Sequence, residues 1–125
     1  MSTQEKIHSF TDLKAWQKAH QLTLEIYKIT KDFPSEERYG LVDQMRRASI
    51  SVSSNIAEGF SRHSTKEKQQ FYHQALGSLT ELQNQLLVAR DVRYIANDVF
   101  QVLAILSVEV SKLIRSLLKY LNTKY

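Results

Sequence analysis

The sequence predicts an all-α protein, an antiparallel up-down-up-down four-helix bundle. Glycine and proline, the residues that interrupt helices, occur only three times and once in 125 residues. Apolar residues recur every three or four positions in four long segments, which is the period of an amphipathic helix. The connections between these segments are short, so consecutive helices are expected to run antiparallel. Residues 1–125 are therefore expected to form one domain around one core.

The first helix is expected over residues 11–32. Thr11 is a preferred N-cap residue, and Pro34 ends the helix because the residue before a proline avoids helical geometry. One side of this helix is expected to face the core, with His20 hydrogen-bonded inside it. The residues on this side are Leu13, Trp16, His20, Leu24 and Tyr27.

The second helix is expected over residues 36–59, with Ser35 as its N-cap residue. Gly59 stands where a residue in the left-handed conformation commonly ends a helix. The expected core-facing residues are again three or four positions apart: Leu41, Met45, Ala48, Val52 and Ile56.

The last two helices are expected over residues 65–91 and 97–121. Ser64 and Glu67 have the spacing of a capping box, and Asn97 is a suitable N-cap residue for the fourth helix. The third helix has the expected core residues Phe71, Ala75, Leu79, Leu82, Leu86 and Ala89. The fourth helix has Val99, Leu103, Leu106, Val110, Leu113, Leu117 and Leu121.

The first and fourth helices carry more apolar surface than one bundle core can use. Residues 99–110 are apolar on most of the helix circumference. The first helix has apolar residues on several faces, namely Leu22, Leu24, Ile26, Tyr27 and Ile29. Scattered exposed apolar residues are normal on proteins, but an accumulation of this size favours a subunit interface. We therefore expect a homo-oligomer.

A polar stripe runs along the second helix beside its apolar side. Its members are Arg47, Ser51, Ser54 and Glu58. Arg47 and Glu58 are separated by about 16 Å of helical rise, so each needs a partner elsewhere. Antiparallel pairing with the third helix places Arg47 near Glu81, and an ion pair between them is expected. Gly77 is expected to allow close approach of the two helices, because a glycine inside a helix otherwise costs about 1 kcal/mol.

The segment Asn55–Gly59, with the sequence Asn-Ile-Ala-Glu-Gly, belongs to a pattern that covers nearly the whole chain. The other main positions of the pattern are Leu41, Gln44, Arg46, Arg47, Ala48, Ser51, Phe71, Gly77, Ser78, Glu81 and Leu82. With this pattern the chain resembles the four-helix-bundle family of 23S rRNA intervening-sequence proteins. The reading frames of that family occur in insertions within bacterial 23S rRNA genes and elsewhere in genomes.

The resemblance implies homopentamers of antiparallel bundles, no known catalytic activity and a proposed role in nucleic-acid binding. The accessory variability proteins of diversity-generating retroelements are similar in fold, and they are basic pentamers that bind a reverse transcriptase and RNA. The resemblance gives no task to Arg47, Asn55, Glu58 and Glu81. For these residues a structural polar network is favoured over a binding site, because buried polar groups in bundles usually satisfy one another.

The formal net charge of +4 is concentrated near the end of the chain, because the residues after Glu109 include four basic side chains and no acid. A smaller basic cluster lies at the turn before the third helix. The expected phosphate-binding residues are Arg62, Lys66, Lys112, Arg115 and Lys119. Antiparallel helices bring the two groups to one end of the bundle. Basic residues near a helix C-terminus also complement the helix dipole and aid solubility, but repetition around a ring favours phosphate binding.

The sequence offers no sign of catalysis, of a cofactor or of a metal site. The absence of cysteine excludes disulfides, thiol nucleophiles and Cys-ligated metals. The Glu-x-x-His spacing of di-iron bundles occurs only at Glu5 and His8, ahead of the first helix. Trp16, Tyr27 and Phe71 are expected to lie in the core rather than to stack on bases.

The chain is expected to be cytoplasmic and to have no membrane partner. Its longest stretch without charge is about half of what a bilayer span needs, and the first residues lack an apolar signal segment.

Two hypotheses of function remain from the sequence. The first is a non-catalytic homo-oligomer, a pentamer by resemblance, that binds RNA or DNA through a basic face. The second is a protein-interaction scaffold, such as an accessory subunit that docks a reverse transcriptase, in which the charge is incidental.

Overall fold

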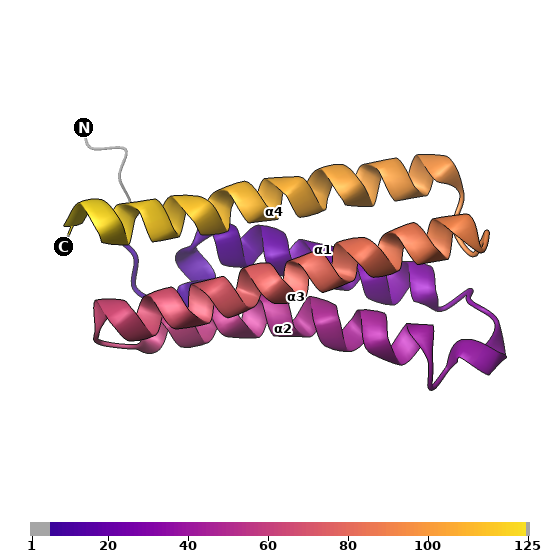
Figure 1. Cartoon of the computed structure of the whole chain (residues 1–125), viewed down its shortest axis with the longest axis horizontal. Coiled ribbons are helices and arrows are strands. Elements are labelled where there is room, and N and C mark those ends of the chain that lie inside the picture. The colour runs from indigo at the N-terminus through magenta and orange to yellow at the C-terminus, as the bar shows by residue number, and fades with distance from the viewer. Residues whose placement is uncertain (1–5, 125) are drawn as a thin grey trace.

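Four long helices form the molecule, as Figure 1 shows. The computed structural model describes residues 6–124, so Glu5 lies outside the described residues. The helices are α1 (Lys14–Thr30), α2 (Leu41–Ser61), α3 (Thr65–Asp91) and α4 (Asn97–Lys124), with short 3₁₀ turns η1 (Phe10–Asp12) and η2 (Ser35–Glu37). Each helix contacts the next in sequence, and α1 also contacts α4. The predicted antiparallel four-helix bundle is confirmed.

The first helix begins later than expected, because a capped 3₁₀ turn precedes it. Ser9, not Thr11, is the capping residue, and its side-chain oxygen accepts from the Thr11 N–H at 3.2 Å. The Asp12 carboxylate accepts from the N–H groups of His8 and Ser9 at 2.8 and 3.1 Å, and these bonds lower its pKa. The chain is then extended at Leu13, so α1 starts only at the following residue.

The second helix also differs from its expected bounds. Ser35 begins a separate 3₁₀ turn, and α2 starts at Leu41, whose N–H donates to the Glu37 carboxylate at 3.1 Å. At its other end α2 continues past Gly59, which is not in the left-handed conformation.

Gly59 is needed for a close approach between α2 and α3. A Cβ atom at this position would lie 2.5 Å from Cε1 of Tyr72. The same role was wrongly predicted for Gly77, which has open space around its Cα. At the turn into α3 the serine cap is confirmed, since the Ser64 side chain accepts from the Glu67 N–H at 3.1 Å. The reciprocal bond of a capping box, from the Ser64 N–H to the Glu67 side chain, is not formed among the described residues.

The core-facing side of α1 was predicted wrongly. The buried residues are Ala15, Ala19, Leu22, Thr23, Ile26 and Thr30. Two alanines allow close packing there, and the Thr23 hydroxyl donates to the Ser49 carbonyl of α2 at 3.1 Å. Of the expected side, Leu13 and Trp16 are half-buried and pack against the core, whereas Leu24 is exposed. His20 is exposed, and its ring stacks on Trp16 with 4.7 Å between ring centroids.

The three aromatic residues expected in the core are only half-buried. On α3, Tyr72 occupies the core position that was expected for Phe71. Trp16, Tyr27 and Phe71 are all half-buried, whereas Tyr72 is buried against Gly59.

The buried side of α4 agrees with the prediction near the middle of the helix and at Leu121, but at Val99 it is shifted by one residue, since Phe100 is buried instead. Leu103, Leu106 and Val110 are buried as expected. Further along, the expected residues Leu113 and Leu117 are half-buried. The residues that follow them, Ile114 and Leu118, are buried instead. The shift follows from helix geometry, because a strict repeat of seven residues drifts around a straight α-helix.

Candidate nucleic-acid interface

The two halves of the bundle differ in charge. We define the basic end as residues 6–21, 52–77 and 111–124, which are the halves of the four helices, with their connections, that meet at one end. The basic end has ten lysines and arginines against three acidic residues, whereas residues 22–51 and 78–110 have seven against nine. The excess positive charge of the chain therefore lies at one end of the molecule.

The start of α3 and the end of α4 meet at the basic end. The Gln69 side-chain amide donates to Asn122 Oδ1 at 2.9 Å. Three of the predicted phosphate-binding residues lie on this part of α4: Lys112, Arg115 and Lys119. All three are exposed, and none forms an ion pair with another residue in the described range 6–124. Lys124 continues α4, but its side chain lies outside the description.

The cations at the turn between α2 and α3 have different surroundings. Lys66 is exposed and has no ion-pair partner among residues 6–124. Arg62 pairs with Glu58 at 2.9 Å, and its guanidinium lies 4.7 Å from the centre of the Phe71 ring. A phosphate at Arg62 would therefore compete with a carboxylate, whereas Lys66 is accessible.

Lys68 stabilises the end of α2. Its Nζ donates to the carbonyls of Phe60 and Gly59 at 2.8 and 3.3 Å. These are carbonyls at the C-terminus of the helix, which carries partial negative charge. Burial lowers the pKa of the Lys68 ammonium.

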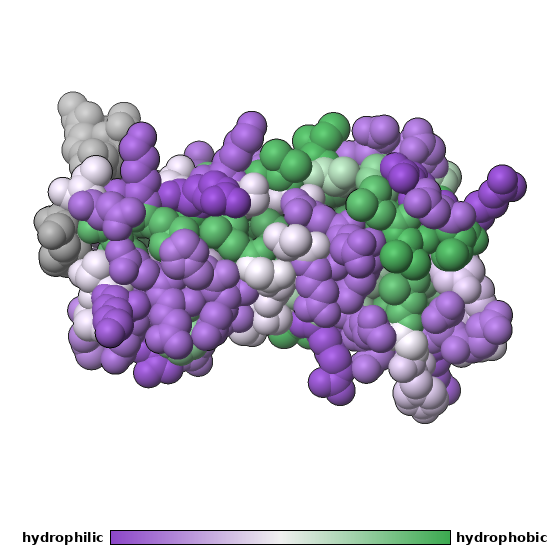
Figure 2. Space-filling model, in the orientation of Figure 1, coloured by the Kyte–Doolittle hydropathy of each residue, from purple (hydrophilic) through white to green (hydrophobic). Residues whose placement is uncertain are grey.

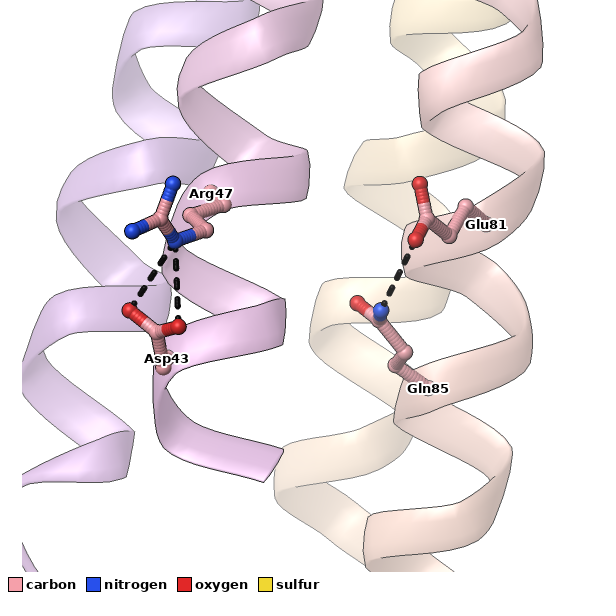
Figure 3. A network of polar contacts seen from close by, with 4 residues as sticks. All are labelled: Asp43, Arg47, Glu81 and Gln85. Atoms are coloured by element: carbon pink, nitrogen blue, oxygen red, sulfur yellow. Dashed lines mark hydrogen bonds and ion pairs between the residues drawn. The ribbon is translucent and has the colours of Figure 1, made fainter. Parts of the chain in front are cut away.

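The expected ion pair between Arg47 and Glu81 is absent from the structure. Figure 3 shows the Arg47 guanidinium directed at Asp43 on its own helix, with Nε donating at 3.0 and 3.1 Å. Glu81 accepts from Gln85 on α3 at 3.4 Å. Asp43 lies one turn before Arg47, so the guanidinium reaches it without crossing to another helix. The Arg47 side chain is 79% exposed.

Near the middle of α2 and α3, smaller polar groups connect the two helices. The hydroxyls of Ser51 and Ser78 are 2.8 Å apart, and Asn55 donates to the carbonyl and hydroxyl of Ser51 at 2.8 and 3.1 Å. The expected single polar network is therefore wrong, because its four members bind separate partners. Asn55 belongs to the contact at Ser51, whereas Arg47 pairs with Asp43, Glu58 with Arg62, and Glu81 with Gln85.

Apolar side chains are exposed along the first half of α4. Val102 and Ile105 are 65% and 67% exposed, and Val108 is also exposed. Leu87 of α3 is also exposed, and it lines a pocket together with Ala104 and Val108 of α4. Figure 2 shows hydrophobic residues reaching the surface along α4, toward the right of the view. The expected excess of apolar surface on α4 is therefore present on this isolated chain.

Residues 6–124 contain neither a cluster of metal-ligating side chains nor a membrane-spanning helix. Within this range no three His, Cys, Asp or Glu side chains gather closely enough to hold a metal ion. None of the helices described has the length and hydropathy needed to cross a bilayer.

Comparisons with known proteins agree with the fold. A solved structure with a TM-score of 0.78 and 22% sequence identity covers 84% of this chain and 95% of its own. It is a protein of unknown function from the S23 ribosomal protein family of Bacteroides thetaiotaomicron. No curated protein matches the sequence. The family model for the 23S rRNA-intervening sequence protein matches residues 11–116. The chain therefore belongs to the 23S rRNA intervening-sequence protein family.

Proposed function

We propose that this protein is a non-catalytic, cytoplasmic homo-oligomer that binds RNA through its basic end. The observation that carries the proposal is the excess of ten basic over three acidic residues at that end. Lys66, Lys112, Arg115 and Lys119 are exposed there without acidic partners among the described residues. The family description, which refers to 23S rRNA, makes an rRNA-derived RNA the first ligand to test.

Binding through these residues would follow the phosphate backbone rather than the base sequence. Lysine and arginine on exposed helix turns contact phosphates and release counterions, and each contact makes the affinity more sensitive to salt. The sequence contains no recognised RNA-reading module, so no base-specific contact is part of the proposal. Arg62 would contribute only after it exchanges Glu58 for a phosphate.

Self-association would strengthen this function, because one basic end alone offers only a few phosphate contacts. The proposed interface includes Val102, Ile105 and Val108, whose exposed side chains would leave water on contact with another copy. Pentamers are the assembly that the family resemblance implies. A ring would present several basic ends to one RNA and would multiply the phosphate contacts.

The test is a titration of an rRNA-derived RNA with the wild-type protein and with two charge variants. The Lys112→Glu and Arg115→Glu double variant reverses charge at the basic end. The control double variant, Lys28→Glu with Arg47→Glu, makes the same change in net charge in the other half. We expect binding at about 50 mM salt that weakens steeply toward 200 mM. The first variant should lose most of this binding, and the control should retain it.

Absence of binding by the wild-type protein at about 50 mM salt would refute the proposal. So would equal losses in the two variants, because net charge rather than the basic end would then explain the binding.

A protein-interaction scaffold is the second candidate, and the exposed apolar residues of α4 favour it. In that case the partner, such as a reverse transcriptase, would be captured equally well by the wild-type protein and by the Lys112→Glu and Arg115→Glu variant. Loss of capture in this variant would exclude a purely incidental role for the charge.

A further inference from the structure

An open pocket of about 440 Å³ lies between the end of α1 and the start of α2, in the half of the bundle away from the basic end. Its lining includes the cations Lys31, Arg38 and Arg46 and no acidic residue. Thr30 and Ser35 add hydroxyl groups, and Phe33 contributes an apolar wall. The size is within the range of small-ligand pockets.

Arg46 is held in place without a carboxylate. Its Nε donates to the Thr30 hydroxyl at 3.0 Å, and its Nη2 donates to the Tyr27 carbonyl at 3.4 Å. The guanidinium also lies 4.5 Å from the centre of the Tyr27 ring. A guanidinium has five N–H donors, so several remain for a ligand. Arg46 is half-buried, and it has no ion-pair partner among residues 6–124.

Two neighbouring acids are held by other groups. Glu37 accepts from the Leu41 N–H and from the Tyr94 hydroxyl at 3.1 and 2.8 Å. Asp43 binds Arg47. The remaining acids nearby in sequence, Asp32 and Glu36, are exposed and do not line the pocket. The end of α1 contributes partial negative charge, but this is small beside three whole positive charges.

We propose that this pocket binds a phosphate-bearing ligand of mononucleotide size. A phosphate group accepts several hydrogen bonds at once and suits the planar donor array of arginine. Arg46 would donate from a fixed position, while Lys31 and Arg38, which are exposed, would close on the anion. The apolar wall at Phe33 gives the remainder of such a ligand a surface to contact. This proposal is independent of the proposed RNA binding, because the two sites lie in opposite halves of the bundle.

The experiment is calorimetric titration of the full chain with adenosine monophosphate, inorganic phosphate and adenosine. We expect binding of the two phosphate-bearing compounds, tighter for adenosine monophosphate, and little or no binding of adenosine. The Lys31→Ala and Arg38→Ala double variant changes only exposed side chains, so its fold should be retained, and it should bind at least about tenfold more weakly. The control is Lys28→Ala, which removes an exposed cation of α1 that does not line the pocket and should leave binding unchanged.

The Lys112→Glu and Arg115→Glu variant should bind adenosine monophosphate as the wild type does, which separates this site from the basic end. The proposal is refuted if the wild-type protein binds neither phosphate compound at about 10 mM, beyond the weak end of specific affinity. It is also refuted if adenosine binds as tightly as adenosine monophosphate, or if Lys31→Ala with Arg38→Ala leaves binding unchanged.

Discussion

Replacement of Gly59 by alanine should destabilise the protein by about 1–2 kcal/mol. The added Cβ would lie 2.5 and 2.8 Å from two ring carbons of Tyr72, and 3.2 Å from the Cβ of Phe71. Tyr72 is only 4% exposed, so its ring has little room to move away.

The magnitude is the difference between two effects. Overpacking of a core costs about 1–3 kcal/mol, and two contacts with a buried ring place this case in the upper half of that range. Alanine stabilises the helix by about 1 kcal/mol relative to glycine, because its helix propensity is higher. The net effect is therefore a lower free energy of unfolding, which corresponds to a fall in Tm of several degrees for a chain of this length.

The assay is urea unfolding followed by far-UV circular dichroism, at one fixed protein concentration because the proposed self-association would shift apparent stability. A double-mutant cycle with Tyr72→Ala tests the cause, since removal of the ring should make Gly59→Ala neutral or stabilising. A Gly59→Ala protein as stable as the wild type would refute the close-approach reasoning. An equal loss from Gly59→Ala in the Tyr72→Ala background would refute the assignment to the ring.

Three further predictions follow from the described contacts. Gly77→Ala should stabilise the protein by about 1 kcal/mol, because open space surrounds this glycine within α3, and unchanged urea midpoints would contradict this. The hydrogen bonds from Leu41 and Tyr94 lower the pKa of Glu37 below 4.5, so Glu37 favours folding when ionised. That stability should be present above pH 4.5 and be lost as the pH falls through the lowered pKa, and Glu37→Gln should flatten this part of a urea-midpoint series. Ile105→Glu should convert the proposed homo-oligomer to smaller species in multi-angle light scattering, whereas Gln101→Glu on the same helix should not.

The sequence predicted the fold class well because the signals for it are repeated along the chain. The bounds 65–91 of α3 agree with the structure, since a single serine cap at residue 64 defines the start of the helix. The start of α1 was missed because the residue before it, Leu13, is extended and forms no side-chain cap bond. The capping side chains, Ser9 and Asp12, belong to the preceding turn η1 instead. The core-facing side of α1 was missed because hydrophobicity outweighed the small size of Ala15 and Ala19 in the prediction.

The candidate site was predicted in part for similar reasons. Exposure of Lys112, Arg115 and Lys119 follows from helical spacing alone. The partner of Arg47 could not be predicted from spacing in this way. Antiparallel pairing of α2 and α3 suggested Glu81 on the other helix, but Asp43 lies one turn away on the same helix and binds Arg47 instead. The role of Lys68 required the structure, since its ammonium reaches back across a turn to carbonyls of α2.

The uneven distribution of charge also has a consequence for the kinetics of the proposed RNA binding. Because the basic end is one end of an elongated bundle, the free molecule carries an electric dipole moment along its helices. A polyanion in solution exerts a torque on this dipole before any contact, and the molecule arrives with its basic end foremost. Charge reversal at Lys112 should therefore lower the association rate constant more than it raises the dissociation rate constant.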